Sequence, residues 1–90
     1  MLYTLMIDFK GGTYISQGIG SSLANGFESA IDNQAFTDIP DFSSASKEKI
    51  KAEAVEDGFI PLEGLKNVYC ATCEIDNSLA IFNLIATNET

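Results

Sequence analysis

The strongest constraint on the fold is an alternating apolar segment at the start of the chain, with two glycines soon after it. Within residues 2–9 the odd positions are all large and apolar: Tyr3, Leu5, Ile7 and Phe9. A repeat of two residues places these side chains on one face of a β-strand. Residues 10–12, Lys-Gly-Gly, can supply the positive φ that short hairpin loops require. We therefore predict a β-hairpin over residues 2–17.

The register of this hairpin depends on the length of its loop. A three-residue loop pairs Phe9 with Thr13 and places Ile7 opposite Ile15. A loop of the two glycines alone pairs Phe9 with Tyr14, and this one-residue slip moves Ile15 to the other face. We prefer the three-residue loop, because it keeps Ile15 on the apolar face beside Ile7.

Two helices and a second hairpin are predicted after the first hairpin. In residues 23–33, apolar side chains recur at every fourth position, and Ser21 or Ser22 can cap the first turn. Residues 45–57 are rich in Lys and Glu, which indicates a helix at the surface. The second hairpin has its own apolar alternation, in residues 68–75 and 79–86.

These elements predict a single α+β domain over residues 1–90, with the element order ββααββ. The four strands are expected to form one antiparallel sheet. The first and last strands are the most apolar and belong in the centre, so the predicted strand order is 2-1-4-3. Both helices are expected to cover one face of the sheet.

The charge of the chain argues against several classes of partner. Thirteen Asp and Glu residues against five Lys give a net charge of −8. Nucleic acids and anionic membranes are held mainly by Lys and Arg, so we expect neither as a partner. No apolar run approaches the ~20 residues of a membrane span, and Asp8 and Lys10 interrupt the run that a secretory signal would need. We therefore expect a cytoplasmic protein with reduced cysteines.

The motifs that could support chemistry are incomplete. Cys70 and Cys73 match C-x-x-C, but residues three apart on a strand point to opposite faces, and two cysteines without His cannot supply about four zinc ligands. Gly18-Ile-Gly20 lacks the third glycine of a dinucleotide-binding loop. Asp38 and Asp41 lack the spacing of a calcium-binding loop. We therefore predict that the protein is not an enzyme and has no catalytic residue, no cofactor and no metal.

The pattern YTLMIDFKGGTYISQ at residues 3–17, followed by the helix at residues 23–31, resembles the start of small uncharacterised bacterial domains. It is also similar to the HicB-like antitoxin domain, which begins with short strands and then a helix. The likeness covers about the first third of the chain, and no functional residue is carried over from it. The second hairpin and the lack of a basic DNA-binding extension depart from a full antitoxin.

These observations predict a non-catalytic, acidic protein-interaction module. We expect its surface to include Met6, Tyr14, Tyr69 and Cys70. Residues 13–17 and 68–75 are the predicted sheet edges, whose unpaired N–H and C=O groups favour a weak homodimer through an edge or the adjoining face. One alternative is an acidic inhibitor, or an antitoxin or immunity-type partner, of a basic protein, since opposite charge steers association. The other is a small-ligand binder or enzyme without a recognisable motif.

Overall fold

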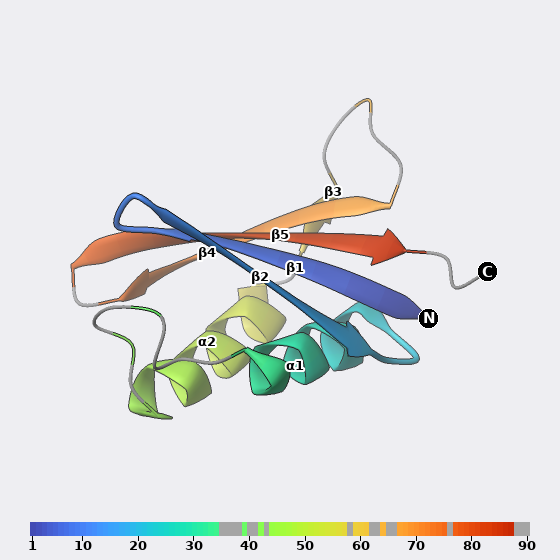
Figure 1. Ribbon diagram of the computed structural model, residues 1–90, viewed down its shortest axis with the longest axis horizontal. Helices are drawn as coiled ribbons and strands as arrows, with labels where there is room; N and C mark the ends of the chain where they lie inside the picture. The colour runs from blue at the N-terminus through green and yellow to red at the C-terminus, as the bar shows by residue number, and fades with distance from the viewer. Residues whose placement is uncertain are drawn as a thin grey trace.

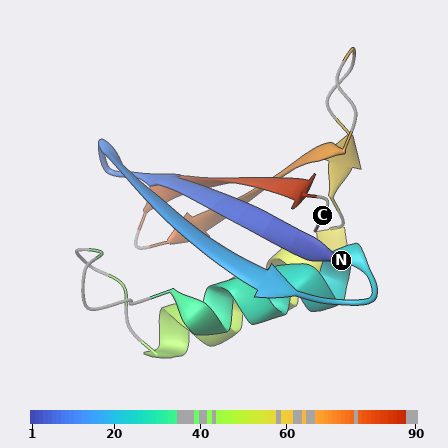
Figure 2. The same ribbon diagram turned by 45° about the vertical axis from the view of Figure 1, so that its right-hand side comes forward.

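The computed structural model describes residues 1–34, 39, 42, 44–57, 59–61, 64, 67–75 and 77–87. A five-stranded antiparallel sheet has two helices on one of its faces (Figures 1 and 2). The elements follow in chain order as β1 (Leu2–Phe9), β2 (Gly12–Ile19), α1 (Leu23–Asn33), α2 (Ser44–Asp57), β3 (Ile60–Pro61), β4 (Val68–Ile75) and β5 (Ser78–Thr87). Among the described residues, neither helix is long and apolar enough to cross a membrane.

The sheet confirms the α+β class and the antiparallel pairing, and it corrects the predicted number of strands. The strand order is β2-β1-β5-β4-β3, with five strands instead of four in the order 2-1-4-3. The extra strand is β3, in which Ile60 and Pro61 pair with Cys70 and Tyr69. The element order is therefore ββααβββ and not ββααββ. A two-residue strand containing proline is too short to show an alternating pattern in the sequence.

The first hairpin closes in a register that neither predicted loop produces. Its loop is Lys10 and Gly11, so that Phe9 pairs with Gly12. Both loop residues have positive φ, 48° and 80° respectively, as a type I′ turn requires. This turn suits the twist of the two strands, and lysine takes a position that glycine was expected to hold. The preferred register was therefore wrong by one residue, which leaves Ile15 outside the core and 62% exposed.

The core lies between the sheet and the two helices. Its largest fully buried side chains come from both layers: Leu5, Ile7, Phe9, Phe27, Ile31, Ile50, Phe82 and Leu84. The ring of Phe27 on α1 packs edge-on against Phe82 of β5, with 5.6 Å between ring centroids, and against Phe59 at 4.9 Å. Each such side chain stabilises the fold by about 1.5–3 kcal/mol relative to leaving it exposed.

Helix α1 packs directly on the sheet because glycines remove the side chains that would hold it away. A Cβ on Gly18 of β2 would collide with the backbone of Ser29 and Ala30, and a Cβ on Gly26 would collide with the Tyr3 ring. The helix begins at its cap, Ser22, whose Oγ accepts a hydrogen bond from the backbone N–H of the third helical residue.

Candidate functional site

The face of the sheet that points away from the helices, which we call the outer face, is the principal functional candidate. Side chains alternate along each strand, and the paired registers place the following together on it: Leu2, Thr4, Met6 and Asp8; Thr13, Ile15, Gln17 and Ile19; Ile60; Val68, Cys70, Thr72 and Glu74; and Leu79, Ile81, Asn83, Ile85 and Thr87. No described helix or strand covers this face (Figures 1 and 2).

A row of paired residues, which we call the central row, crosses the outer face from one edge strand to the other: Ile15, Met6, Asn83, Cys70 and Ile60. Asn83 lies at the centre of this row, because β5 is the third of five strands. It also lies near the middle of its own strand, Ser78–Thr87. The central row is thus apolar or sulfur-bearing except at its midpoint, where it carries an amide.

The outer face holds several large apolar side chains that remain in water. Ile19 is 65% exposed, Ile60 68% and Leu79 58%. Isolated exposed apolar residues are ordinary. These share the face with partly buried apolar neighbours, Leu2, Met6, Ile81 and Ile85, and polar side chains lie between them. The four long strands β2, β1, β5 and β4, about 4.8 Å apart and each about eight to ten residues long, give a face of roughly 500–600 Å². This is the area of the whole face, polar residues such as Thr4, Gln17 and Thr72 included.

Two of the four residues predicted for an interaction surface lie on the outer face, and two do not. Met6 and Cys70 are there, each paired directly with Asn83. Tyr14 lies on the helix-facing side and packs against the core, because the observed register pairs it with a buried residue of β1. Tyr69 also lies on the helix-facing side, since it pairs with buried Leu84. The prediction that Tyr14 sits off the core face was wrong, as a result of the hairpin register.

Sequence reasoning missed most of the exposed apolar residues of this face. A signal was present in β5, where Leu79, Ile81 and Ile85 stand between the core positions of the same strand. A strand with one face in water normally alternates apolar with polar residues. The three apolar residues on the outer face of β5 therefore depart from that pattern.

The two cysteines lie on opposite faces of β4, as predicted. Cys73 is buried on the helix-facing side, and its Sγ donates a hydrogen bond to Oε2 of Glu53 on α2, at 2.9 Å. Cys70 is half-buried on the outer face. Within the described residues, no three His, Cys, Asp or Glu side chains gather where they could hold a metal ion. Asp38 and Asp41 lie outside those residues.

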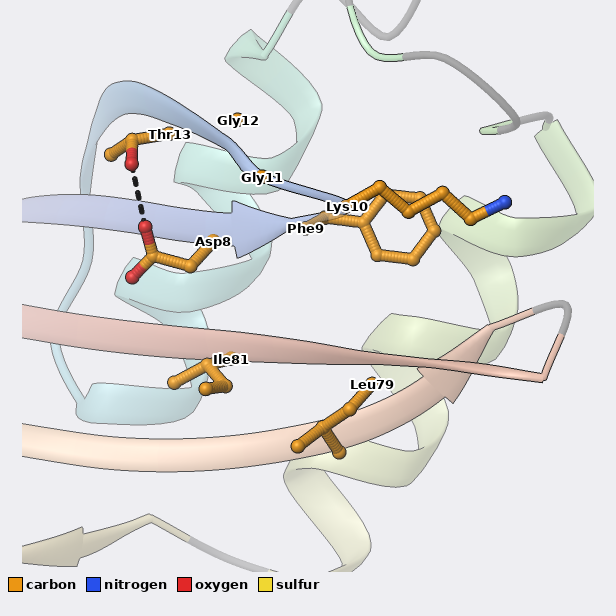
Figure 3. A pocket seen from close by; sticks show the side chains of 8 residues that line it. All are labelled: Asp8, Phe9, Lys10, Gly11, Gly12, Thr13, Leu79 and Ile81. Atoms are coloured by element: carbon orange, nitrogen blue, oxygen red, sulfur yellow. Dashed lines mark hydrogen bonds between the residues drawn. The ribbon is translucent and has the colours of Figure 1, made fainter.

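A shallow pocket of about 310 Å³ opens at the β1–β2 turn end of the outer face (Figure 3). Thr13 and Asp8 face each other at its wall, where Thr13 Oγ1 donates a hydrogen bond to Asp8 Oδ1 at 2.6 Å. The Lys10 side chain extends away from this pair, with its Nζ 5.4 Å from the centroid of the Phe9 ring. The pocket therefore has no group of polar side chains converging on one point, and it extends the outer face instead of forming a separate site.

Charge is concentrated on the helices and is sparse on the outer face. Asp32 of α1 forms ion pairs with Lys51 at 2.9 Å and Lys47 at 3.3 Å on α2. The hydrogen bond from Lys51 is the main reason that the pKa of Asp32 lies below its ordinary value. Among the strand residues described, Asp8 and Glu74 are the charged groups of the outer face.

Comparisons with protein-family models, with characterised proteins and with solved structures find no match to this chain. The resemblance of its first third to the HicB-like antitoxin domain therefore stays a prediction.

Proposed function

We propose that this protein is a non-catalytic interaction module that binds a protein partner through the outer face of its sheet. The observation that supports this proposal is the set of large apolar side chains left in water there, with Ile15, Ile19 and Ile60 each more than 60% exposed. Fully burying one such side chain is worth about 1.5–3 kcal/mol, which a partner could recover. The proposed compartment is the cytoplasm, whose reducing conditions suit the two free cysteines.

The shape of the outer face favours a protein over a small ligand. Small-molecule sites are concave and hold a few convergent polar groups. The pocket at the β1–β2 turn is shallow, and its Asp8 carboxylate already accepts a hydrogen bond from Thr13. A broad apolar sheet surface instead matches the core of a protein–protein interface, where charged residues are depleted.

A second candidate function, an acidic inhibitor or an antitoxin or immunity-type partner of a basic protein, would use the opposite side of the molecule. The net charge is −8; α1 carries Glu28 and Asp32 and no Lys, whereas α2 carries Glu48 and Glu53 together with Lys47, Lys49 and Lys51. A basic partner would be steered toward the molecule by this overall charge.

The test is to compare partner capture by two variants of equal charge. The face variant carries Met6→Lys and Ile81→Lys on the outer face, and the control variant carries Ser21→Lys and Ala52→Lys at positions outside it. Each is used, beside the wild type, to capture proteins from the native cell, and the bound proteins are quantified by mass spectrometry. Partners retained by the control and lost by the face variant support the proposal. Equal capture by both variants contradicts it, and loss by the control alone supports the acidic-inhibitor alternative.

A further inference from the structure

We propose that the outer face binds a second copy of this chain, about a two-fold axis that lies along the central row and brings the two Asn83 side chains together. This inference rests on the proposed function, because it names the partner of the same face. Four features support it: the amide at the centre of the face, its area, the location of its charges and the state of the sheet edges.

The Asn83 amide is suited to pair with its own copy. It lies at the middle of an otherwise apolar row, between Met6 and Cys70. Within the described part of the chain, the side-chain amide of Asn83 makes no hydrogen bond. An amide is both a donor and an acceptor, so two of them related by a two-fold axis can satisfy each other. A single polar residue in an apolar seam also fixes the register of association, as asparagine does in coiled coils.

The area of the outer face is sufficient for a weak symmetric dimer. Two faces of roughly 500–600 Å² that pack about 10 Å apart, as stacked sheets do, bury roughly 1,000–1,200 Å² in total. This value reaches the lower limit for a specific protein–protein interface. We therefore expect an association that depends on protein concentration in solution.

The charges on the outer face select the direction of the axis. Asp8 and Glu74 both lie toward the end of the sheet that holds the β1–β2 turn, since they pair with Ile81 and Leu79 of β5. An axis along the strands would bring these acidic ends of the two copies together. An axis along the central row reverses the strand direction and places each acidic end over the uncharged end of the other copy. Each residue of the row then faces its own copy.

The edge strands are less suited to join two copies. On β2, the backbone N–H of Ile19 donates a hydrogen bond to Ser29 Oγ at 3.3 Å, and the backbone carbonyl of Gln17 accepts one from Asn33 Nδ2 at 2.8 Å. Two side chains of α1 thus occupy two backbone groups near the C-terminal end of that edge. The other edge begins with β3, which has two residues, one of them Pro61, and pairs only with Cys70 and Tyr69. Beyond β3 the edge is β4 itself, where the Glu74 carbonyl accepts a hydrogen bond from Lys49 Nζ at 2.9 Å. A short edge strand that contains proline resists pairing with another strand.

The experiment is sedimentation velocity on the purified full chain at low and high salt, over a range of protein concentrations. The wild type should form a dimer that strengthens with salt, because screening reduces the repulsion between two chains of charge −8. Asn83→Asp opposes two carboxylates at the centre and should raise the dimer dissociation constant by about 100-fold. Asn83→Leu should keep the dimer. Asn25→Asp is the matched control, because it adds the same charge on α1 and should leave the dimer intact.

A cross-linking arm tests the same geometry without any change at Asn83. Because Cys70 would face Cys70 of the second copy, a short bis-maleimide should cross-link the wild type into dimers, and Cys70→Ser should abolish the product. A wild type that stays monomeric at every concentration and salt overturns the second-copy proposal, while the capture experiment still decides whether the face binds another protein. A dimer unaffected by Asn83→Asp and not cross-linked through Cys70 overturns the two-fold arrangement.

Discussion

Ile7 of β1 is paired with Tyr14 of β2, and this single pairing decides which residues of β2 face water. Because side chains alternate along a strand, Tyr14 and Gly18 face the helices, whereas Ile15 and Ile19 lie on the outer face. A register shifted by one residue would exchange the two sets. The two-residue loop therefore decides which residues of β2 belong to the outer face.

The loop itself gives the first prediction. Lys10 has a φ of 48°, in the left-handed region that costs energy for lysine, and the type I′ turn favours Asn-Gly at its two central positions. Lys10→Asn should therefore raise the free energy of unfolding, by about 0.5–1 kcal/mol. Gly11→Ala should lower it by about 1 kcal/mol, since alanine is strained at the Gly11 φ of 80°. Urea denaturation measures both changes, and a stabilising Gly11→Ala would contradict the observed turn.

Local alternation was sufficient to predict the long strands and insufficient to predict the hairpin register. A strand with one buried face must repeat every two residues, so residues 2–9 and 68–75 could be identified without a structure. The loop could not be placed, because both Lys10-Gly11 and Gly11-Gly12 can supply positive φ. The choice between them depends on strand twist and on packing against α1, which sequence spacing does not contain.

The residues of the outer face were also predicted only in part, because register and tertiary pairing decide some of them. Met6 and Cys70 were placed correctly on the outer face, since their own strands alternate clearly. Tyr14 was misplaced by the one-residue slip. Ile60 was not considered, because β3 exists only through its pairing with β4, which is a tertiary contact.

A second prediction concerns Gly26, where two physical effects oppose each other. In an isolated helix, replacing glycine by alanine is favourable by about 1 kcal/mol. Here the new Cβ would collide with the Cγ, Cδ2 and Cε2 atoms of the Tyr3 ring in the core. Overpacking of this kind costs about 1–3 kcal/mol, so we expect Gly26→Ala to lower the free energy of unfolding. Chemical denaturation checks the sign. Asn25→Ala, one residue away and exposed, is the control for the effect of alanine on the helix.

The ion pair between α1 and α2 makes a third prediction, about pH. The pKa of Asp32 is lowered, mainly by the hydrogen bond from Lys51. A depressed carboxyl pKa contributes stability above the ordinary value of 3.8 and loses it as the pH falls through the folded-state pKa. The melting temperature of wild type should therefore exceed that of Asp32→Asn at pH 6, and the difference should vanish well below pH 3.8. High salt should reduce this difference in melting temperature, because it screens the ion pair. A difference that persists in acid would exclude the ion pair as its cause.

The fourth prediction is the reactivity of the two thiols. Cys73 is 4% exposed and hydrogen-bonded to Glu53, whereas Cys70 is half-buried on the outer face. A thiol reagent should label one cysteine in the native protein and two in denaturant, since burial blocks the second. Cys70→Ser should remove the native labelling while leaving one site in denaturant. Rapid labelling of both thiols in the native wild type would contradict the burial of Cys73.

The last prediction compares Ile7 and Ile15, which lie on neighbouring strands and on opposite faces of the sheet. Ile7→Ala should lower the free energy of unfolding by about 2–5 kcal/mol, because it opens a cavity in the core. Ile15→Thr should change the stability of the single chain by no more than about 0.5 kcal/mol, since threonine suits an exposed strand position. If the outer face is covered by a second copy, the unfolding midpoint of the wild type should rise with protein concentration, because binding stabilises the folded state. Ile15→Thr should weaken that dependence while leaving the midpoint at low concentration unchanged. Equal losses for the two variants in dilute protein would show that Ile15 belongs to the core and would remove the basis for a binding surface.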